Sequence, residues 1–416
     1  MSFSKLGLTD SLCTAVARLG YEHPTPVQAA SIPLVLGGRD LLARAQTGTG
    51  KTAAFGLPMI QRLGAAGSRV TSRPRGLVLV PTRELAVQVQ RAIASYGTPM
   101  RLRVTAIYGG VAMGPQIRVL RQGADIVVAT PGRLIDHLQR RSIDLSAIEM
   151  LTLDEADRML DMGFLPPLRR VIPALPAHQT LLFSATLSSE VQCLATEFTR
   201  NPVRVDVSNE QAVAPTVTHR VHLVAHDRKR ELLVHVLTQE PAGQALVFCK
   251  TQHGTDKVAS HLERAGIKVA VIHGNKSQGA RTRSLADFKA GRVTVLAATD
   301  IAARGLDIAQ LPLVVNYDLP LVAETYIHRI GRTGRAGLAG RAISLVSAAD
   351  RELLRDIQRL LPAPVEQVRV DGFDATNAST PVQSPHPPRV QPRANAHRRP
   401  RRAPSHTSAR RVMQFR

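Results

Sequence analysis

The segment LTLDEADRML places three carboxylates within four positions of a strongly basic chain, at Asp154, Glu155 and Asp157. Acidic residues are common at the start of a helix, where they interact favourably with the helix dipole and do no chemistry. They can also form a catalytic pair, in which one carboxylate binds a divalent cation and the next activates a water molecule. Taken alone, the segment favours neither interpretation.

A second segment, AQTGTGKT, begins at Ala45 and matches the phosphate-binding loop except that Ala45 replaces the first glycine of the pattern. Gly48 and Gly50 allow backbone N–H groups to point at phosphate oxygens. Lys51 is expected to reach the β- and γ-phosphates, and the hydroxyl of Thr52 is expected to bind Mg²⁺. The sequence therefore predicts a nucleotide site.

The phosphate loop changes the interpretation of the acidic segment. An apolar run that ends in Asp-Glu is the usual second half of such a site. We therefore predict that Asp154 binds Mg²⁺ and that Glu155 polarises the water that attacks the γ-phosphate.

A third segment, YIHRIGRTGR, carries three arginines and two glycines and ends at Arg335. A glycine-containing loop can present guanidinium groups to the negative charge that builds on the transferred phosphoryl group. Because this segment lies far downstream of the phosphate loop, we expect hydrolysis to require closure of two domains.

The elements that must position these residues follow an α/β pattern. Short apolar, β-branched runs alternate with segments of helical periodicity, which predicts parallel sheets covered by helices on both faces. Strands are expected at residues 76–81, 125–130, 150–153, 180–186, 245–248, 268–272, 293–298 and 313–317. Helices are expected at 133–139 and 229–239, and residues 201–219 are interpreted as the hinge between two domains.

Composition narrows the class of protein. No apolar run is long enough for a membrane span, and the N-terminus lacks the pattern of a signal peptide. Cys13, Cys193 and Cys249 are isolated, so we expect small buried side chains in a reducing cytosol, without zinc or disulfides.

The charge predicts a polyanionic partner. The net charge is +22, and residues 375–416 contain nine arginines and no Lys, Asp or Glu, which leaves +13 on residues 1–374. The segment from residue 371 onward is rich in Pro, Arg and Ser and is expected to be a disordered tail that tethers RNA.

In their order along the chain, these motifs resemble those of DEAD-box ATP-dependent RNA helicases, over about residues 1–365. The resemblance implies tandem RecA-like domains at residues 1–205 and 220–370, joined by a linker at 206–219. It also implies ATP and Mg²⁺ as cofactors and RNA as the partner, contacted through its backbone with little sequence preference. The short N-terminus, the SFSKLGL opening and the basic tail are most similar to the bacterial RhlE-type branch.

The resemblance also implies the roles of individual residues in ATP hydrolysis. The segment GYEHPTPVQ is similar to the Q motif, whose glutamine recognises the adenine edge. The implied ATP-binding residues are Phe3, Tyr21, Thr25, Gln28, Ala45, Gln46, Thr47, Gly48, Thr49, Gly50, Lys51, Thr52, Gly305 and Asp307, with Arg332 and Arg335 reaching the γ-phosphate. The residues implied to couple hydrolysis to unwinding are Asp157, Ser184, Thr186, His328 and Arg329, with His328 and Arg329 acting through Asp157.

The implied RNA contacts come from both domains. They are Pro81, Thr82, Arg83, Gly109, Gly110, Thr130, Pro131, Gly132 and Arg133 in the first, and Thr251, Gly274, Gln278, Arg281 and Thr299 in the second. Aromatic residues make up 3% of the chain and tryptophan is absent, so a base-stacking platform is not expected.

The function expected from these features is RNA-stimulated ATP hydrolysis with local separation of short RNA duplexes, in ribosome assembly or RNA turnover. An ATP-gated RNA clamp or annealing protein needs the same motifs and stays open as an alternative. A DNA helicase is less favoured, because DNA-acting relatives usually carry Gln in place of His328. We further expect a cytoplasmic monomer.

Overall fold

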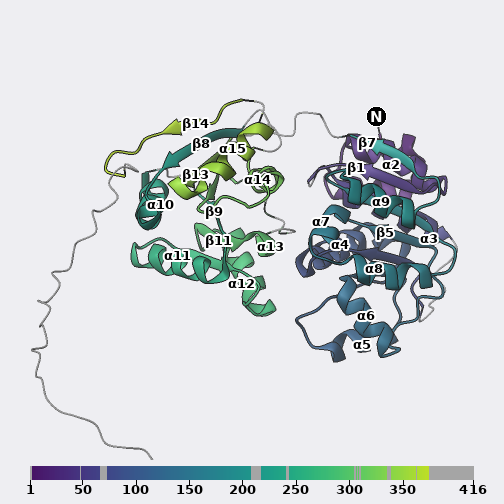
Figure 1. The fold of residues 1–416 in the computed structure, drawn as a ribbon. Helices are drawn as coiled ribbons and strands as arrows, with labels where there is room; N and C mark the ends of the chain where they lie inside the picture. The colour runs from purple at the N-terminus through teal and green to yellow at the C-terminus, as the bar shows by residue number, and fades with distance from the viewer. Residues whose placement is uncertain are drawn as a thin grey trace, which may run out of the picture. The chain divides into compact units, whose positions relative to one another are not determined.

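The computed structural model describes residues 2–46, 48–65, 73–207, 217–239, 243–303, 306, 308, 311–334, 339–361 and 363–373. Within them, two lobes each contain one sheet with helices on both faces (Figure 1). The described residues of both lobes belong to one compact unit. No helix in this part of the chain is long and apolar enough to cross a membrane.

The first lobe extends to β7. Its strands are β1 (Leu41–Arg44), β2 (Gly76–Leu79), β3 (Val104–Ile107), β4 (Ile126–Ala129), β5 (Met150–Leu153), β6 (Gln179–Ser184) and β7 (Val203–Asp206). Its helices are α1 (Asp10–Arg18), α2 (Pro26–Leu36), α3 (Lys51–Ala65), α4 (Arg83–Gly97), α5 (Met113–Arg121), α6 (Pro131–Gln139), α7 (Ala156–Asp161), α8 (Leu165–Val171) and α9 (Ser189–Phe198). Short 3₁₀ turns lie at Phe3–Leu6, Thr98–Met100 and Ile172–Ala174.

The second lobe begins with β8. Its strands are β8 (Val217–Leu223), β9 (Ala245–Cys249), β10 (Val269–Ile272), β11 (Val295–Thr299), β12 (Leu313–Asn316), β13 (Gly340–Val346) and β14 (Glu366–Val368). Its helices are α10 (Lys229–Gln239), α11 (Gln252–Arg264), α12 (Gln278–Lys289), α13 (Asp300–Ala303), α14 (Ala323–Ile330) and α15 (Arg351–Leu360). Its 3₁₀ turns lie at His226–Arg228 and Ala348–Asp350.

The two sheets have the same topology. The strand order is β3-β4-β2-β5-β6-β1-β7 in the first lobe and β10-β11-β9-β12-β13-β8-β14 in the second, so each strand has a counterpart seven positions later. The pairings in both sheets are parallel. All strands of a sheet therefore end at the same edge, where ligands bind in open parallel sheets.

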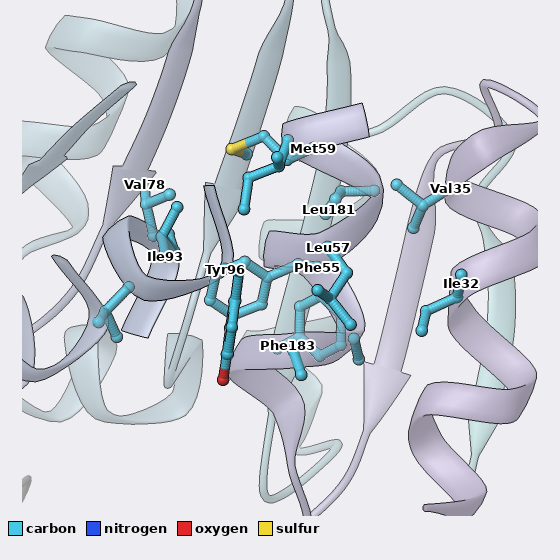
Figure 2. Packing of buried hydrophobic residues seen from close by; sticks show 14 of the residues in the cluster. Ile32, Val35, Phe55, Leu57, Met59, Val78, Ile93, Tyr96, Leu181 and Phe183 are labelled. Atoms are coloured by element: carbon cyan, nitrogen blue, oxygen red, sulfur yellow. The ribbon is translucent and has the colours of Figure 1, made fainter. Parts of the chain in front are cut away.

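Alternate strand residues form two cores on opposite faces of the first sheet. Ala43, Val78 and Phe183 pack with α1 to α4, whereas their sequence neighbours pack with α5 to α9. Figure 2 shows the first of these cores, in which the rings of Phe55 and Phe183 lie 5.4 Å apart between centroids. In the second lobe, α10 and α11 cover one face and α12 to α15 cover the other.

The structure confirms the predicted α/β class and places a strand in each of the eight predicted strand segments. The hinge prediction at residues 201–219 is wrong at both ends, because Val203–Asp206 forms β7 and Val217–Leu223 forms β8. β7 is an edge strand in which Val205 is the only buried residue, so it lacks the apolar run that marks a central strand.

Two smaller expectations also need correction. Cys249 is buried and Cys13 is half-buried, but Cys193 is exposed because it lies off the buried face of α9. The predicted tail begins too early, because Phe373 still packs against the second-lobe core. The rest of the tail, and residues 208–216 of the predicted linker, lie outside the described residues.

Candidate ATP and RNA site

Three neighbouring strands of the first sheet end at the residues predicted to hold ATP. β5, β6 and β1 pair side by side. The pair Asp154 and Glu155 follows β5, Ser184 ends β6, and the phosphate loop follows β1. The parallel topology thus brings segments that are more than 100 residues apart to one edge of the sheet.

These segments line a pocket of about 390 Å³. The lining residues are Tyr21, His23, Thr25, Gln28, Gly48, Gly50, Lys51, Thr52, Ala53, Leu85, Gln88, Ala92, Tyr96, Asp154, Glu155, Leu306, Ile308 and Arg332. The pocket therefore contains both predicted catalytic carboxylates, the phosphate-loop lysine and one of the two predicted arginines.

Lys51 lies in this pocket as a buried cation. It is the first residue of α3, its side chain is 6% exposed, and Nζ has no hydrogen-bond partner among the described residues. Burying an ammonium group without a partner is unfavourable, so the site fits an anionic ligand that supplies acceptors. Gly48 and Gly50 have φ of 88° and 91°, which glycine adopts without strain and which shape the loop around that position.

Asp154 is 3% exposed, and its Oδ1 accepts a hydrogen bond from the Glu155 N–H at 3.0 Å. Burial raises the pKa of Asp154 to about 6, although the nearby Lys51 opposes the shift. A buried carboxylate and the Thr52 hydroxyl are oxygen ligands of the kind that Mg²⁺ prefers, so these residues fit the predicted metal.

Asp154→Asn is expected to stabilise the ligand-free protein at pH 7.5. Burial raises the pKa of the Asp154 carboxyl from 3.8 to about 6, so the folded protein loses stability when this group is ionised. The loss reaches its full size above pH 6 and disappears below the pKa of the unfolded state. The shift corresponds to about 3 kcal/mol. Thermal melts should show a higher Tm for the variant at pH 7.5 and a difference that narrows toward pH 5. A difference that grows on acidification would contradict the pKa of Asp154.

Glu155 is held in a strained and highly charged environment. Its backbone is left-handed, with φ 54° and ψ 53°, which is uncommon outside glycine and often marks a functional site. Burial acts to raise the pKa of Glu155, but Arg158, Lys51 and Arg332 outweigh it and hold the pKa below its usual value. Arg158 donates to Glu155 at 2.6 Å, with both side chains buried. Glu155 is therefore ionised at neutral pH, as a base must be.

The Q-motif residues contact the phosphate loop and line the same pocket. Gln28 Oε1 accepts from the Thr25 N–H at 2.9 Å, and Nε2 donates to the Gly50 carbonyl at 3.1 Å. Each amide atom keeps one further hydrogen-bonding position. The Thr25 hydroxyl belongs to the capping box of α2 and also lines the pocket, which gives the pocket another polar group for a base edge.

The pocket contains an aromatic pair, Tyr21 and Tyr96, of which the sequence predicted only Tyr21. Tyr21 is 39% exposed, and its hydroxyl lies 3.1 Å from the hydroxyl of Tyr96, which is 3% exposed. Tyr96 was missed because it belongs to α4, 75 residues away, and no local motif marks it. Phe3, predicted to lie near ATP, instead packs in the first-lobe core and does not line the pocket.

Asp157 joins the acidic segment to the segment Ser184-Ala185-Thr186. Its Oδ2 accepts hydrogen bonds from the backbone N–H groups of Ala185 and Thr186 at 3.1 Å and from the Thr186 hydroxyl at 3.2 Å. Asp157 and His328 line one small pocket. This geometry fits the predicted coupling role of Asp157.

Asp157→Asn is expected to lower duplex unwinding per ATP hydrolysed by about tenfold or more, since a hydrogen bond to a charged group contributes about 1.5–3 kcal/mol. Strand separation and phosphate release should be measured together. Asp144→Asn, which removes a surface carboxylate paired with Arg73, is the matched control. An equal loss of hydrolysis and unwinding would contradict a coupling role.

Arg329, also predicted to couple the lobes through Asp157, is bonded within the second lobe. Its guanidinium donates to both carboxylate oxygens of Asp300 at 2.6 and 2.7 Å and to Asn316 at 2.9 Å. It lies 4.9 Å from the centre of the Phe248 ring. Arg329 therefore braces α14 against the sheet, and none of its described contacts reaches Asp157.

The predicted RNA residues of the first lobe follow three further strands of the sheet. Pro81 to Arg83 follow β2, Gly109 and Gly110 follow β3, and Thr130 to Arg133 follow β4. β3, β4 and β2 are adjacent, so these segments share one half of the carboxyl edge. Gly110 has φ 76°, and a Cβ there would overlap the Arg83 guanidinium.

The second lobe repeats this placement on β9, β10 and β11. Thr251 follows β9, Gly274 follows β10, and Thr299 ends β11. Gln278 and Arg281, also predicted RNA contacts, both bond Glu84, at 2.9 Å in each case. Four predicted site residues, Thr47, Gly305, Asp307 and Arg335, lie outside the described residues.

Comparison with known proteins agrees with this arrangement. The DEAD/DEAH box helicase profile matches residues 25–194, and that of the helicase conserved C-terminal domain matches residues 228–337. The RNA helicase CrhR of Synechocystis is 43% identical over 367 residues, 88% of this chain and 74% of that protein. The chain belongs to the DEAD-box helicase family.

Other members of the DEAD-box family show how far the similarity extends. The ATP-dependent RNA helicase DeaD of Escherichia coli is 45% identical over 371 residues, 89% of this chain, but the chain spans only 58% of DeaD. The structure of S. cerevisiae Dbp5 bound to RNA and ADP BeF3 superposes with a TM-score of 0.77 at 32% identity, covering 89% of this chain and 96% of Dbp5. The finer RhlE-type assignment stays a prediction.

Proposed function

We propose that this DEAD-box protein is an ATP-dependent RNA helicase, in which RNA-stimulated hydrolysis is coupled to closure of the lobes and local unwinding of short duplexes. The observation that carries the proposal is that the predicted ATP residues and the predicted RNA residues lie on two neighbouring parts of one sheet edge. β5, β6 and β1 end at the ATP residues, and β3, β4 and β2 end at the RNA-motif residues. CrhR and DeaD are named RNA helicases, and Dbp5 binds RNA and a nucleotide analogue in its structure.

In the proposed mechanism, ATP is the substrate. Lys51 and the backbone N–H groups of the phosphate loop bind the β- and γ-phosphates. The phosphate oxygens supply the hydrogen-bond acceptors that the buried ammonium group of Lys51 otherwise lacks. Thr52 and Asp154 would hold Mg²⁺, which would supply positive charge beside the phosphate oxygens. Glu155 orients the attacking water and takes its proton at a carboxylate oxygen.

Arg332 acts from the second lobe. It lines the ATP pocket and contributes to the low pKa of Glu155, which supports a role in stabilising charge on the γ-phosphate. Asp157 links the ATP pocket to the second lobe. Its Oδ2 accepts hydrogen bonds from Ala185 and Thr186, and Asp157 and His328 line the same small pocket. RNA held along both lobes would favour closure and thereby hydrolysis.

The deciding experiment measures phosphate release with no nucleic acid, with single-stranded RNA and with DNA of the same sequence, alongside unwinding of a short RNA duplex. We expect RNA to stimulate hydrolysis more than DNA and the duplex to separate only with ATP. RNA-stimulated hydrolysis without strand separation would favour an ATP-gated clamp, and equal stimulation by DNA would overturn RNA specificity. Co-sedimentation with ribosomal precursors would favour a role in ribosome assembly, and its absence would favour a role in RNA turnover.

Deleting residues 375–416 is expected to weaken RNA binding and flatten its dependence on salt. Each phosphate contact of a basic side chain adds roughly 0.7 to the slope of log K against log salt for a single strand. Binding should be measured by anisotropy between about 50 and 200 mM salt, the range in which this electrostatic contribution changes most. An unchanged slope would show that the nine arginines do not contact RNA.

A further inference from the structure

A basic groove lies on the second lobe, away from the ATP pocket, between α10 and α11, which are adjacent in the fold (Figure 1). We call it the α10–α11 groove. Its lining residues are Arg230 of α10 and His253, Asp256, Lys257, Ser260 and Arg264 of α11. Three of the six are permanently cationic, and one is acidic.

The single carboxylate of the groove is already neutralised. Asp256 Oδ2 lies 3.0 Å from His273 Nε2, and Oδ1 lies 3.0 Å from Lys276 Nζ. Although burial opposes the shift, these two partners hold the pKa of Asp256 below its usual value. Asp256 therefore does not offset the positive charge of the groove.

The cations of the groove lack such counter-ions. Arg230 and Lys257 are exposed and have no hydrogen bond or ion pair within the described chain, and Arg264 donates only to the backbone carbonyl of Ser260, at 3.1 Å. Other arginines of this lobe do pair with carboxylates, for example Arg228 with Glu231 and Arg292 with Asp287. The groove thus keeps a concentrated positive charge available to an external anion.

The spacing of the groove residues suits an extended anion. His253, Lys257, Ser260 and Arg264 follow one another at three- and four-residue intervals and so share one face of α11. From the first to the last, the helix rises about 17 Å. Since phosphates of a nucleic acid strand recur about every 3.4 Å along a duplex axis, this face can lie along several of them.

The two helices that form the groove also contact a predicted RNA residue and the described C-terminal segment. α11 begins next to Thr251, a predicted RNA contact whose hydroxyl accepts from the Gly254 N–H at 3.0 Å. On the other side, Phe373 packs on α10, with the Arg228 guanidinium 4.6 Å and the His235 ring 5.4 Å from its centre.

We propose that the α10–α11 groove is a second RNA-binding surface, which holds the phosphate backbone of RNA that extends beyond the strand contacted at the sheet edges. The proposal rests on the RNA helicase function proposed above. Because the groove offers charge and no Phe, Tyr or Trp side chain, it binds without sequence preference. It lengthens the RNA footprint without adding a catalytic group.

The test compares Arg230→Ala/Lys257→Ala with a matched control, Arg351→Ala/Arg355→Ala, which removes two exposed arginines from α15 of the same lobe. Affinity of the full chain is measured for RNA strands of roughly 6 and roughly 20 nucleotides across a range of salt. For the long strand, the groove variant should have a slope of log K against log salt that is about 1.4 smaller than that of the unaltered chain. Its loss of affinity relative to the unaltered chain should therefore shrink about sevenfold between about 50 and 200 mM salt. The control should follow the unaltered chain, and Arg230→Lys/Lys257→Arg should restore the slope.

Other outcomes overturn the proposal in distinguishable ways. If the groove variant has the same affinity and salt slope as the control on both strands, RNA does not bind in the groove. An acidic protein partner would then be favoured. Equal losses on the short and long strands would place these residues on the strand already held at the sheet edges. Failure of the unaltered chain to bind either strand would reject the proposed function itself along with this inference.

Discussion

Glu155→Gln is expected to lower kcat for ATP hydrolysis by about 10²- to 10⁴-fold while binding of ATP and RNA is retained, because general-base catalysis contributes about that much. The substitution keeps the size of the side chain and removes its ability to take a proton. Arg158 can still donate to the amide oxygen, so the left-handed backbone at position 155 keeps its support.

The electrostatics of the site explain why the loss should be confined to turnover. The pKa of Glu155 is held low despite its burial, so the wild-type residue is ionised at neutral pH. Asp154 keeps its own carboxylate, and the Thr52 hydroxyl is unchanged, so the proposed Mg²⁺ ligands remain. The variant should therefore accumulate with ATP and RNA bound.

Single-turnover phosphate release and equilibrium binding of a fluorescent ATP analogue, each with saturating RNA, separate the two effects. Glu149→Gln is the matched control, because Glu149 is a half-exposed surface carboxylate paired with Arg75 at 2.5 Å. Glu149 does not line the ATP pocket, so the control should hydrolyse ATP at the wild-type rate. Normal turnover of Glu155→Gln would remove Glu155 from the catalytic step.

The sequence predicted the parts of the site that depend on a few consecutive residues. The phosphate loop and the Asp154-Glu155 pair need particular residue types at fixed spacing, and the structure places them in one pocket. Eight strands were also predicted, because strands buried on both faces are continuous apolar runs. Six strands, β1, β3, β7, β8, β13 and β14, were missed. In β3, β7, β8 and β14, partly exposed residues interrupt such runs.

What the sequence could not predict depends on pairs that only the fold brings together. Tyr96 meets Tyr21 because α4 packs beside the pocket, and nothing near Tyr96 in the chain marks it. Arg329 looked like a residue that acts across the lobes, since it follows His328, but successive helix residues face different directions. Its side chain instead turns inward to Asp300. Arg158 could have been found, because it lies three residues after Glu155 at the start of a helix.

Lys51→Ala is expected to weaken ATP binding by about 10- to 150-fold, since a hydrogen bond between charged groups contributes about 1.5–3 kcal/mol. The structure adds a second reason. Lys51 lowers the pKa of both Asp154 and Glu155, so its removal leaves two buried carboxylates with less positive charge beside them and makes the pocket less favourable to a polyphosphate.

Isothermal titration with a non-hydrolysable ATP analogue measures the effect directly. Lys5→Ala is the control, because Lys5 is the other lysine of residues 1–205 and its side chain is exposed. Lys51→Arg tests geometry against charge: the guanidinium keeps the charge but is larger and planar, so it should not fit the buried position of Nζ. If the arginine variant binds the analogue as tightly as the wild type, charge alone accounts for the role of Lys51. Unchanged affinity in Lys51→Ala would instead exclude the phosphate loop as the nucleotide site.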